Sequence, residues 1–280
     1  MSTDIIQIEP IAGAIGAEIG GIDMAQPLGN QAFQEVHDAL MRHHVIFFRD
    51  QDITPAQHVA FGRQFGSLHI HPFAPALDEA PEVMILESSA ENRSSANLWH
   101  SDVTFEEEPA LGSILLAREV PDHGGDTMWA NAYAAYEALS DRMQRYLDGL
   151  VAVHSAGEVR FDKLYEKGDG RKSEATAKPQ TRAPVEHPVV RTHPVTGRKA
   201  LYVNSIFTRR IRGMSKKESS AVLAFLYDHI ATPEFTCRFH WRRNSVAFWD
   251  NRCTQHYAIA DYGGAHRLMH RVTVNGDRPV

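Results

Sequence analysis

The chain has 280 residues, 43% hydrophobic and 23% charged, which is enough to bury a sizeable core in one large domain or two smaller ones. Its net charge is −6 without a long basic run, and no apolar stretch approaches the roughly 20 residues of a membrane span, which disfavours nucleic-acid and membrane partners. Two distant cysteines, Cys237 and Cys253, exclude a disulfide framework, and the N-terminus lacks the pattern of a signal peptide. We therefore expect a cytoplasmic protein, and the redox role of the two thiols stays open.

The first half of the chain predicts both helices and strands. Phe33, Val36 and Leu40 recur at helical spacing and predict a helix over residues 29–44. A threonine followed by proline at 54–55 has the pattern of a capped helix start. Strands are predicted at 45–50, 83–88, 113–119 and 126–131, and two short helices at 132–140 and 141–150.

The second half begins with residues 157–186, a polar stretch with glycine and proline that predicts a lid-like insertion. Ser215 caps a helix predicted over residues 215–231. Further strands are predicted at 187–194, 199–204, 234–241, 245–251 and 266–276. Because strands outnumber helices and the two do not alternate regularly, we expect a mostly β core surrounded by helices.

One short stretch, NLWHSDVTF at 97–105, carries a candidate metal-binding pair. On an extended strand, His100 and Asp102 project to the same side and Ser101 to the other. A Ser/His/Asp hydrolase is disfavoured, because Ser101 faces away and G-x-S-x-G is absent; both nucleotide-binding glycine motifs are absent too. His256, placed after an apolar strand and before a polar turn, offers a third ligand. Two histidines and one carboxylate match the facial triad of non-haem Fe(II) oxygenases.

The C-terminal strand adds two arginines. Arg267, Met269, Arg271 and Thr273 share one face at a period of two. Two neighbouring guanidinium groups repel each other unless anions lie beside them, and arginine suits carboxylate and sulfo groups. The pattern therefore predicts two anionic ligands near the metal.

Four segments together resemble a known family: WHSDVTF, GGDTMWAN, HPVVRTHPVTGRKALYVN and WDNRCTQHYAIADYGGAHRLMHRVTVNGDRP. They resemble the taurine dioxygenase group of Fe(II)/2-oxoglutarate-dependent oxygenases, which includes alkylsulfatases and aryloxyalkanoate dioxygenases. The resemblance implies a single domain over residues 1–280 with a double-stranded β-helix, or jelly-roll, core. It also implies a homo-oligomer, either a dimer or a tetramer, although no sequence feature tests this.

The resemblance assigns roles to individual residues. His100, Asp102 and His256 match the catalytic iron ligands. Thr127 and Arg267 match the residues that hold the distal carboxylate of 2-oxoglutarate. The substrate's anionic head is expected at Arg271 and His71.

The implied reaction consumes O2 and 2-oxoglutarate and hydroxylates the carbon beside a heteroatom in a small anionic organic substrate. A sulfonate or an alkyl sulfate would release sulfite or sulfate and an aldehyde, and an aryloxyalkanoate would release a phenol. Three positions that surround the amine in the taurine enzyme fall at Ala74, Ala96 and Val159. A buried ammonium without partners costs several kcal/mol, so we expect an anionic head with an apolar tail. Two further alternatives are a zinc-dependent hydrolase that uses the same triad and a non-catalytic jelly-roll binding protein.

Overall fold

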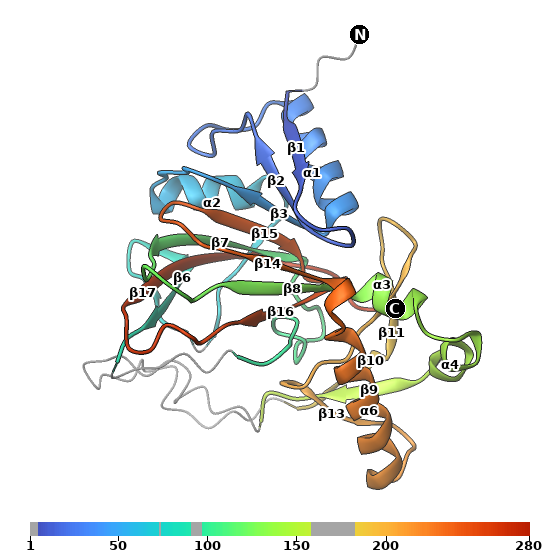
Figure 1. Ribbon diagram of the computed structural model, residues 1–280. Coiled ribbons are helices and arrows are strands. Elements are labelled where there is room, and N and C mark those ends of the chain that lie inside the picture. The colour runs from blue at the N-terminus through green and yellow to red at the C-terminus, as the bar shows by residue number, and fades with distance from the viewer. Residues whose placement is uncertain (1–4, 73, 91–96, 158–182) are drawn as a thin grey trace.

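The computed structural model describes residues 5–72, 74–90, 97–157 and 183–280. The first half of the chain forms a mixture of strands and short helices (Figure 1). In chain order these are β1 (Gln7–Pro10), β2 (Ala17–Gly20), α1 (Asn30–His43), β3 (Val45–Phe48), α2 (Pro55–Arg63), β4 (Leu68–His69), β5 (Ala76–Leu77), β6 (Ala80–Ser88), β7 (Gly112–Glu119), β8 (Thr127–Asn131), α3 (Ala132–Glu137), α4 (Asp141–Leu147) and β9 (Val151–His154).

The second half contributes mainly strands and one long helix. These are β10 (Val185–Pro188), β11 (Val190–Thr192), β12 (Lys199–Leu201), β13 (Thr208–Ile211), α6 (Lys216–Ile230), a 3-10 turn (Pro233–Phe235), β14 (Thr236–Phe239), β15 (Val246–Asp250), β16 (Thr254–Ala258) and β17 (Arg267–Val274).

Two sheets face each other in the centre of the molecule, as Figure 1 shows. Within the described residues, the larger sheet has nine strands in the order β1-β2-β3-β15-β7-β17-β6-β5, with β4 paired to β17. The smaller sheet has the order β14-β8-β16. Among these strands only β2 and β3 pair in parallel, so the core is antiparallel with crossovers between the sheets. This arrangement is the predicted jelly roll.

The central strands of the larger sheet are apolar on both faces because both faces are covered. On β3, Val45 and Phe47 pack between the sheets, whereas Ile46 and Phe48 face helices α1 and α2. The ring of Phe47 stacks on Phe239 of β14 with centroids 4.0 Å apart. This alternation explains why the sequence shows a continuous apolar run here rather than a period of two.

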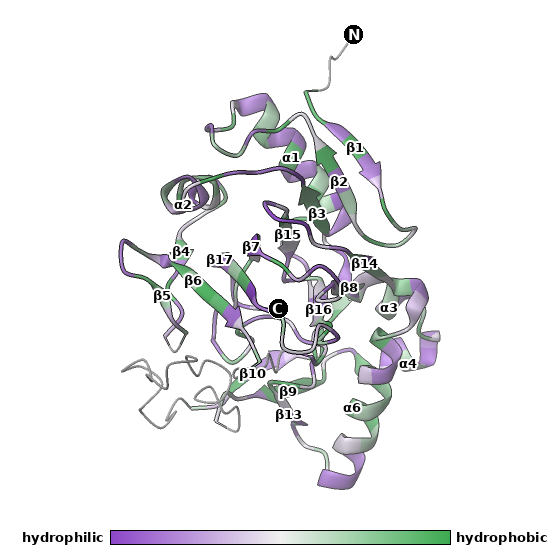
Figure 2. Cartoon of the chain, turned by 60° about the vertical axis from the view of Figure 1, so that its left-hand side comes forward, coloured by the Kyte–Doolittle hydropathy of each residue, from purple (hydrophilic) through white to green (hydrophobic). Residues whose placement is uncertain are grey.

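The helices begin where side chains satisfy their first amide groups. At α2, Thr54 accepts a hydrogen bond from the Gln57 amide, and the Gln57 side chain accepts one from the Thr54 amide. Ser215 and Glu218 form the same reciprocal pair at α6. In Figure 2 helix α6 changes from purple to green around its axis, as expected for a helix with one buried face.

Several sequence predictions need correction. The strand predicted at 187–194 is interrupted at Val189 and splits into β10 and β11, and β10 already begins at Val185, inside the predicted insertion. The rest of the insertion, residues 158–182, lies outside the described residues, as do the predicted substrate positions Ala96 and Val159. The sequence did not predict strands β1, β2, β4, β5, β9, β13 and β16. Most of them are short, and their conformation depends on pairing with strands far along the chain. Among the described residues, no helix has both the length and the apolar character needed to cross a membrane.

Candidate metal centre and anion sites

His100 and His256 lie side by side although 156 positions separate them in the chain. Each backbone amide donates to the other residue's carbonyl oxygen, at 3.1 and 2.8 Å. The pair therefore forms an isolated antiparallel bridge, and the two imidazole rings come to 4.1 Å between centroids. His256 follows the apolar strand β15, as the sequence predicted, and it lies within a further strand, β16, that was not predicted.

Asp102 reaches the same place through a turn, not a strand. The segment that follows His100 turns sharply, and Val103 adopts a φ of 47°, which is unusual for a β-branched residue. Asn251 holds the turn by accepting from the Asp102 amide at 2.7 Å and donating to its carbonyl oxygen at 3.0 Å. Ser101 points away, as predicted, and donates to the Thr254 carbonyl oxygen at 2.7 Å. Sequence reasoning had not identified Asn251, whose contacts join segments that are distant in the chain.

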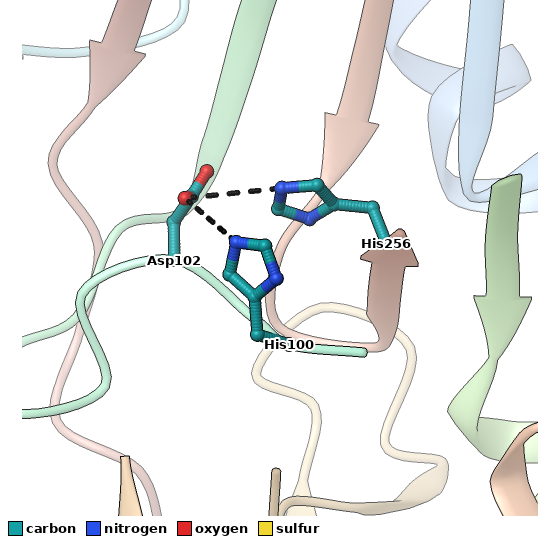
Figure 3. A group of neighbouring side chains, drawn as sticks. All are labelled: His100, Asp102 and His256. Atoms are coloured by element: carbon teal, nitrogen blue, oxygen red, sulfur yellow. Dashed lines mark ion pairs between the residues drawn. The ribbon is translucent and has the colours of Figure 1, made fainter. Parts of the chain in front are cut away.

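The three predicted ligands converge on one point, shown in Figure 3. The Nε2 atoms of His100 and His256 lie 3.9 and 4.0 Å from Oδ1 of Asp102. Each of the three residues has a ligand atom within 4.8 Å of those of the other two, so together they could hold one ion. His100 donates from Nδ1 to the Leu98 carbonyl oxygen at 2.8 Å, which leaves the lone pair of Nε2 for the metal.

The protonation states suit metal binding. Burial lowers the pKa of His100 and holds the pKa of His256 well below the ordinary value, so both rings are neutral. Burial by itself raises the pKa of Asp102, but the charge of the Arg271 guanidinium, helped by the hydrogen bond from Ser113, outweighs it, and the pKa falls well below its usual range. The site therefore offers two neutral imidazoles and one carboxylate, the donor set of a facial triad.

The carboxylate of Asp102 is held by two further groups. Arg271 donates from Nη1 to Oδ1 at 2.8 Å, and Ser113 donates from Oγ to Oδ2 at 2.9 Å. Arg271 is buried, and within the described residues its Nε atom has no hydrogen-bond partner. The sequence predicted an external anion for this arginine; the structure adds that the candidate metal ligand Asp102 is already paired with it. Ser113 was not found from the sequence.

Arg267 lies on the same face of β17, four residues before Arg271. With Met269 and Arg271 it points into the space between the two sheets, as the period of two predicted. Burial lowers the pKa of Arg267, and its Nε has no hydrogen-bond partner among the described residues. A β-carbon added to Gly125 would come within 3.5 Å of Arg267 Cδ. The segment leading into Thr127, at the start of β8, thus lies against this arginine, and a buried cation of this kind calls for an anionic ligand.

His71 lies near Arg271. Its burial and, to a smaller extent, the charge of Arg271 lower the pKa of His71 to about 3. Its Nδ1 accepts from the Ala74 amide at 3.1 Å, so the proton of the neutral ring is on Nε2. Its neighbour in this segment, His69, pairs with Glu106 at 3.3 Å. Ala74, whose backbone amide donates to His71, therefore lies next to this histidine and near the predicted anion site.

A second group of potential ligands, His193, Asp250 and Cys253, does not fit a metal. Arg252 binds both carboxylate oxygens of Asp250, at 2.9 and 2.7 Å. His193 donates from Nε2 to Asp250 at 3.0 Å, and its Nδ1 accepts two amides of the following turn. Because these bonds occupy the carboxylate and imidazole lone pairs, we interpret the cluster as structural.

The jelly roll, its facial triad and the two buried arginines together define the class of Fe(II)- and 2-oxoglutarate-dependent oxygenases. The chain belongs to the taurine catabolism dioxygenase TauD, TfdA family, whose model matches residues 7–273. It is a 2-oxoglutarate-dependent dioxygenase that uses Fe(II) and O2. This overturns the hydrolase and binding-protein alternatives.

Individual relatives cover almost the whole chain. An alpha-ketoglutarate-dependent sulfate ester dioxygenase of Pseudomonas putida is 40% identical over 98% of this chain and 91% of its own length. An alkylsulfatase of Acinetobacter baylyi is 38% identical over 98% and 86%. The crystal structure of a taurine dioxygenase from Burkholderia xenovorans has a TM-score of 0.84 and 38% identity, covering 99% of this chain and 93% of that chain.

Two less similar proteins bear on the alternatives and on the ligands. An alpha-ketoglutarate-dependent 2,4-dichlorophenoxyacetate dioxygenase of Cupriavidus pinatubonensis is 32% identical over 97% of this chain and 98% of its own length. AAD-2, in complex with Mn(II) and N-oxalylglycine, has a TM-score of 0.80 and 32% identity, covering 100% of this chain and 99% of that chain.

Proposed function

We propose that this enzyme oxidises sulfate esters that carry an apolar organic tail. The observation that carries the proposal is the position of Arg271, a buried guanidinium bonded to the metal ligand Asp102 at 2.8 Å. An anion bound there has its adjacent carbon next to the metal. The two relatives of 40% and 38% identity are named for sulfate esters and alkyl sulfates, which supports the sulfate head group.

The proposal assigns a role to each of the predicted site residues. His100, Asp102 and His256 hold the iron, and Arg267 with Thr127 holds the distal carboxylate of 2-oxoglutarate. When bound, iron and 2-oxoglutarate supply the oxidant, consuming O2 and releasing succinate and CO2. The protein supplies position and charge: the buried cation of Arg267 fixes one anion, and the alternation of β17 sets the second anion site four residues away.

The head of the substrate meets two donors of different character. Arg271 offers a permanent charge, and His71 offers a neutral imidazole whose Nδ1 accepts from the Ala74 amide. A sulfate monoester has several terminal oxygens and can accept from both groups. A sulfonate has the same capacity, so the head group alone does not separate these two substrates.

The tail is proposed to lie on apolar side chains. A buried cluster that begins one residue after Asp102 contains Val103, Phe105, Ala110, Ala156 and Phe207. Ile70 and Leu98, next to His71 and near His100 in the chain, keep 57% and 49% of their surface exposed. Apolar surface flanking a buried anion site favours a hydrocarbon tail over the ammonium of taurine. Ala96 and Val159 keep their predicted place in this pocket as part of the proposal.

The proposed reaction balances as a hydroxylation. One oxygen atom of O2 enters the substrate carbon that bears the sulfate group, and the other enters succinate. The new hydroxyl loses its proton as the C=O bond forms, and the carbon–oxygen bond to sulfate breaks with its electrons on the sulfate. The products are an aldehyde, sulfate, succinate and CO2.

A substrate panel tests the proposal. The Fe(II) enzyme is given C6–C8 alkyl sulfates, the matching alkyl sulfonates, taurine and aryloxyalkanoates, and succinate is measured with and without each substrate. We expect the alkyl sulfates to give the highest kcat/KM, with sulfate released in equal amount to succinate. Turnover of taurine as good as that of the alkyl sulfates would refute the proposal, and best turnover of an aryloxyalkanoate would establish the alternative, with release of a phenol.

We also propose that the whole chain is one oxygenase domain that acts in the cytoplasm as a dimer or tetramer. The family match over residues 7–273 supports the single domain. Both cysteines are free thiols in the core, which is compatible with a reducing compartment. Light scattering of the purified protein tests the oligomeric state.

A further inference from the structure

One hydrogen bond connects the proposed 2-oxoglutarate site to a residue to which no role is assigned. The indole Nε1 of Trp241 donates to Oγ1 of Thr127 at 2.9 Å. Both side chains are buried, with 3% and 2% of their surface exposed. The pairing of β14 with β8 places them together, because Phe239 lies opposite Thr127 and Trp241 follows two residues later.

The chemistry of the two groups makes the bond directional. An indole N–H can only donate, whereas a threonine hydroxyl has one proton to donate and two lone pairs to accept. Since Trp241 occupies a lone pair of Thr127, the hydroxyl proton has to point elsewhere. Among the described residues, Trp241 is the hydrogen-bond partner of this hydroxyl. The proton is therefore available for an acceptor that the protein itself does not supply.

We propose that Trp241 is a positioning residue that turns the Thr127 hydroxyl into a donor for the distal carboxylate of 2-oxoglutarate. This inference rests on the proposed function, which assigns Thr127 and Arg267 to that carboxylate. Arg267 can only donate, so the ligand must supply the acceptors, and a carboxylate has enough lone pairs for both residues. Trp241 orders the hydroxyl before the ligand arrives, so that less rotational freedom is lost on binding.

The same core contains a matched control. Trp241 packs edge-on against Phe239, with ring centroids 5.0 Å apart, and lies 6.3 Å from the ring of Trp129. Trp129 is also fully buried in this apolar cluster, but its indole Nε1 has no hydrogen-bond partner among the described residues. Replacing either tryptophan by phenylalanine removes a similar amount of ring, and only Trp241→Phe removes a bond to Thr127.

The experiment measures binding of N-oxalylglycine to the Mn(II) protein by isothermal titration calorimetry. N-oxalylglycine has the distal carboxylate of 2-oxoglutarate and does not turn over. We expect Thr127→Val to weaken binding tenfold or more and Trp241→Phe to weaken it about fivefold. In the Thr127→Val background, Trp241→Phe should change binding less than twofold. Trp129→Phe should leave it within twofold of wild type.

A second ligand distinguishes positioning from general damage. 2-Oxovalerate has the same chain length and chelating end but no distal carboxylate. Its dissociation constant, obtained by competition with N-oxalylglycine in each variant, should therefore not respond to Trp241→Phe. Equal weakening of both ligands, or no weakening of N-oxalylglycine while Thr127→Val weakens it, would overturn the role of Trp241. No effect of Thr127→Val would instead refute the proposed assignment of Thr127. If Trp241→Phe does not fold, 3-benzothienylalanine at position 241 keeps the bicyclic shape, removes the N–H and is held to the same outcomes.

Discussion

Replacing Arg271 by methionine should tighten metal binding while removing the substrate site. The guanidinium Nη1 lies 2.8 Å from Asp102 Oδ1, so with a ligand bond of about 2 Å it is within about 5 Å of the bound ion. At an effective dielectric constant of about 20, each unit of metal charge is then repelled by about 3 kcal/mol. Loss of the arginine's hold on the carboxylate offsets part of this. We therefore expect Mn(II) to bind at least about tenfold more tightly.

The metal-free protein should respond in the opposite direction. Removing one partner of a buried ion pair costs about 3 kcal/mol, because among the described residues the Asp102 carboxylate then retains only the hydrogen bond from Ser113. Urea unfolding without metal should show this loss, and saturating Mn(II) should restore more stability to Arg271→Met than to wild type. Methionine suits the test because it fills a space already bordered by Met84, whose sulfur lies 3.1 Å from Arg271 Nη2.

Calorimetric titration with Mn(II) measures the effect, and Arg267→Met is the control. Arg267 is a buried arginine on the same strand face, but Asp102 is not among its described partners. We expect Arg267→Met to leave Mn(II) affinity within threefold and to weaken N-oxalylglycine strongly, with the reverse pattern for Arg271→Met. Weaker or unchanged Mn(II) binding in Arg271→Met would refute the electrostatic reasoning.

Three further changes test other parts of the site and fold. Asp102→Ala should abolish succinate formation and lower Mn(II) affinity at least a hundredfold; retained Mn(II) binding would show that the carboxylate is not a ligand. Asn251→Ala should lower the free energy of unfolding by about 2–3 kcal/mol in urea, because it removes bonds to both the amide and the carbonyl of Asp102; an unchanged midpoint would contradict this. His266 donates hydrogen bonds to Glu87 and Glu119, and these bonds raise the pKa of its imidazole. The stability that they contribute is therefore complete below the unfolded pKa of about 6.5 and is lost as pH rises through the folded pKa. His266→Gln should therefore lower Tm at about pH 5.5 and leave it unchanged at about pH 9, whereas an equal loss at both would exclude the ionic contribution.

Short sequence patterns predicted those helices and strands that are specified by residues within or next to the element itself. The pair at 54–55 and the cap at Ser215 determine where their helices begin, because a side chain can reach only the amides of its own first turn. The prediction that Arg267 and Arg271 share one face required only that their segment form a strand with one buried face. Short strands such as β9 and β13 carry no comparable signal, and they form because each finds a partner far along the chain.

The metal ligands show where local reasoning reaches its limit. An extended H-x-D segment was expected to bring His100 and Asp102 to one side, yet a turn with a left-handed Val103 does this instead. Such a turn is stable only because Asn251, far along the chain, bonds to both sides of the Asp102 backbone. A backbone conformation that depends on a distant side chain leaves no trace in neighbouring residues.

By itself, the sequence predicted a mostly β chain, three candidate metal ligands and two arginines, and, through resemblance, the class of reaction. Only the tertiary structure decided how these groups act on one another. The register of β17 against β7 sets Thr273 opposite Ser113 and Arg271 two positions further on, so that Ser113 and Arg271 bind the two oxygens of Asp102. Strand register is a property of pairs of segments, and a charge shared between a metal ligand and a substrate anchor therefore exists only after the sheets have assembled.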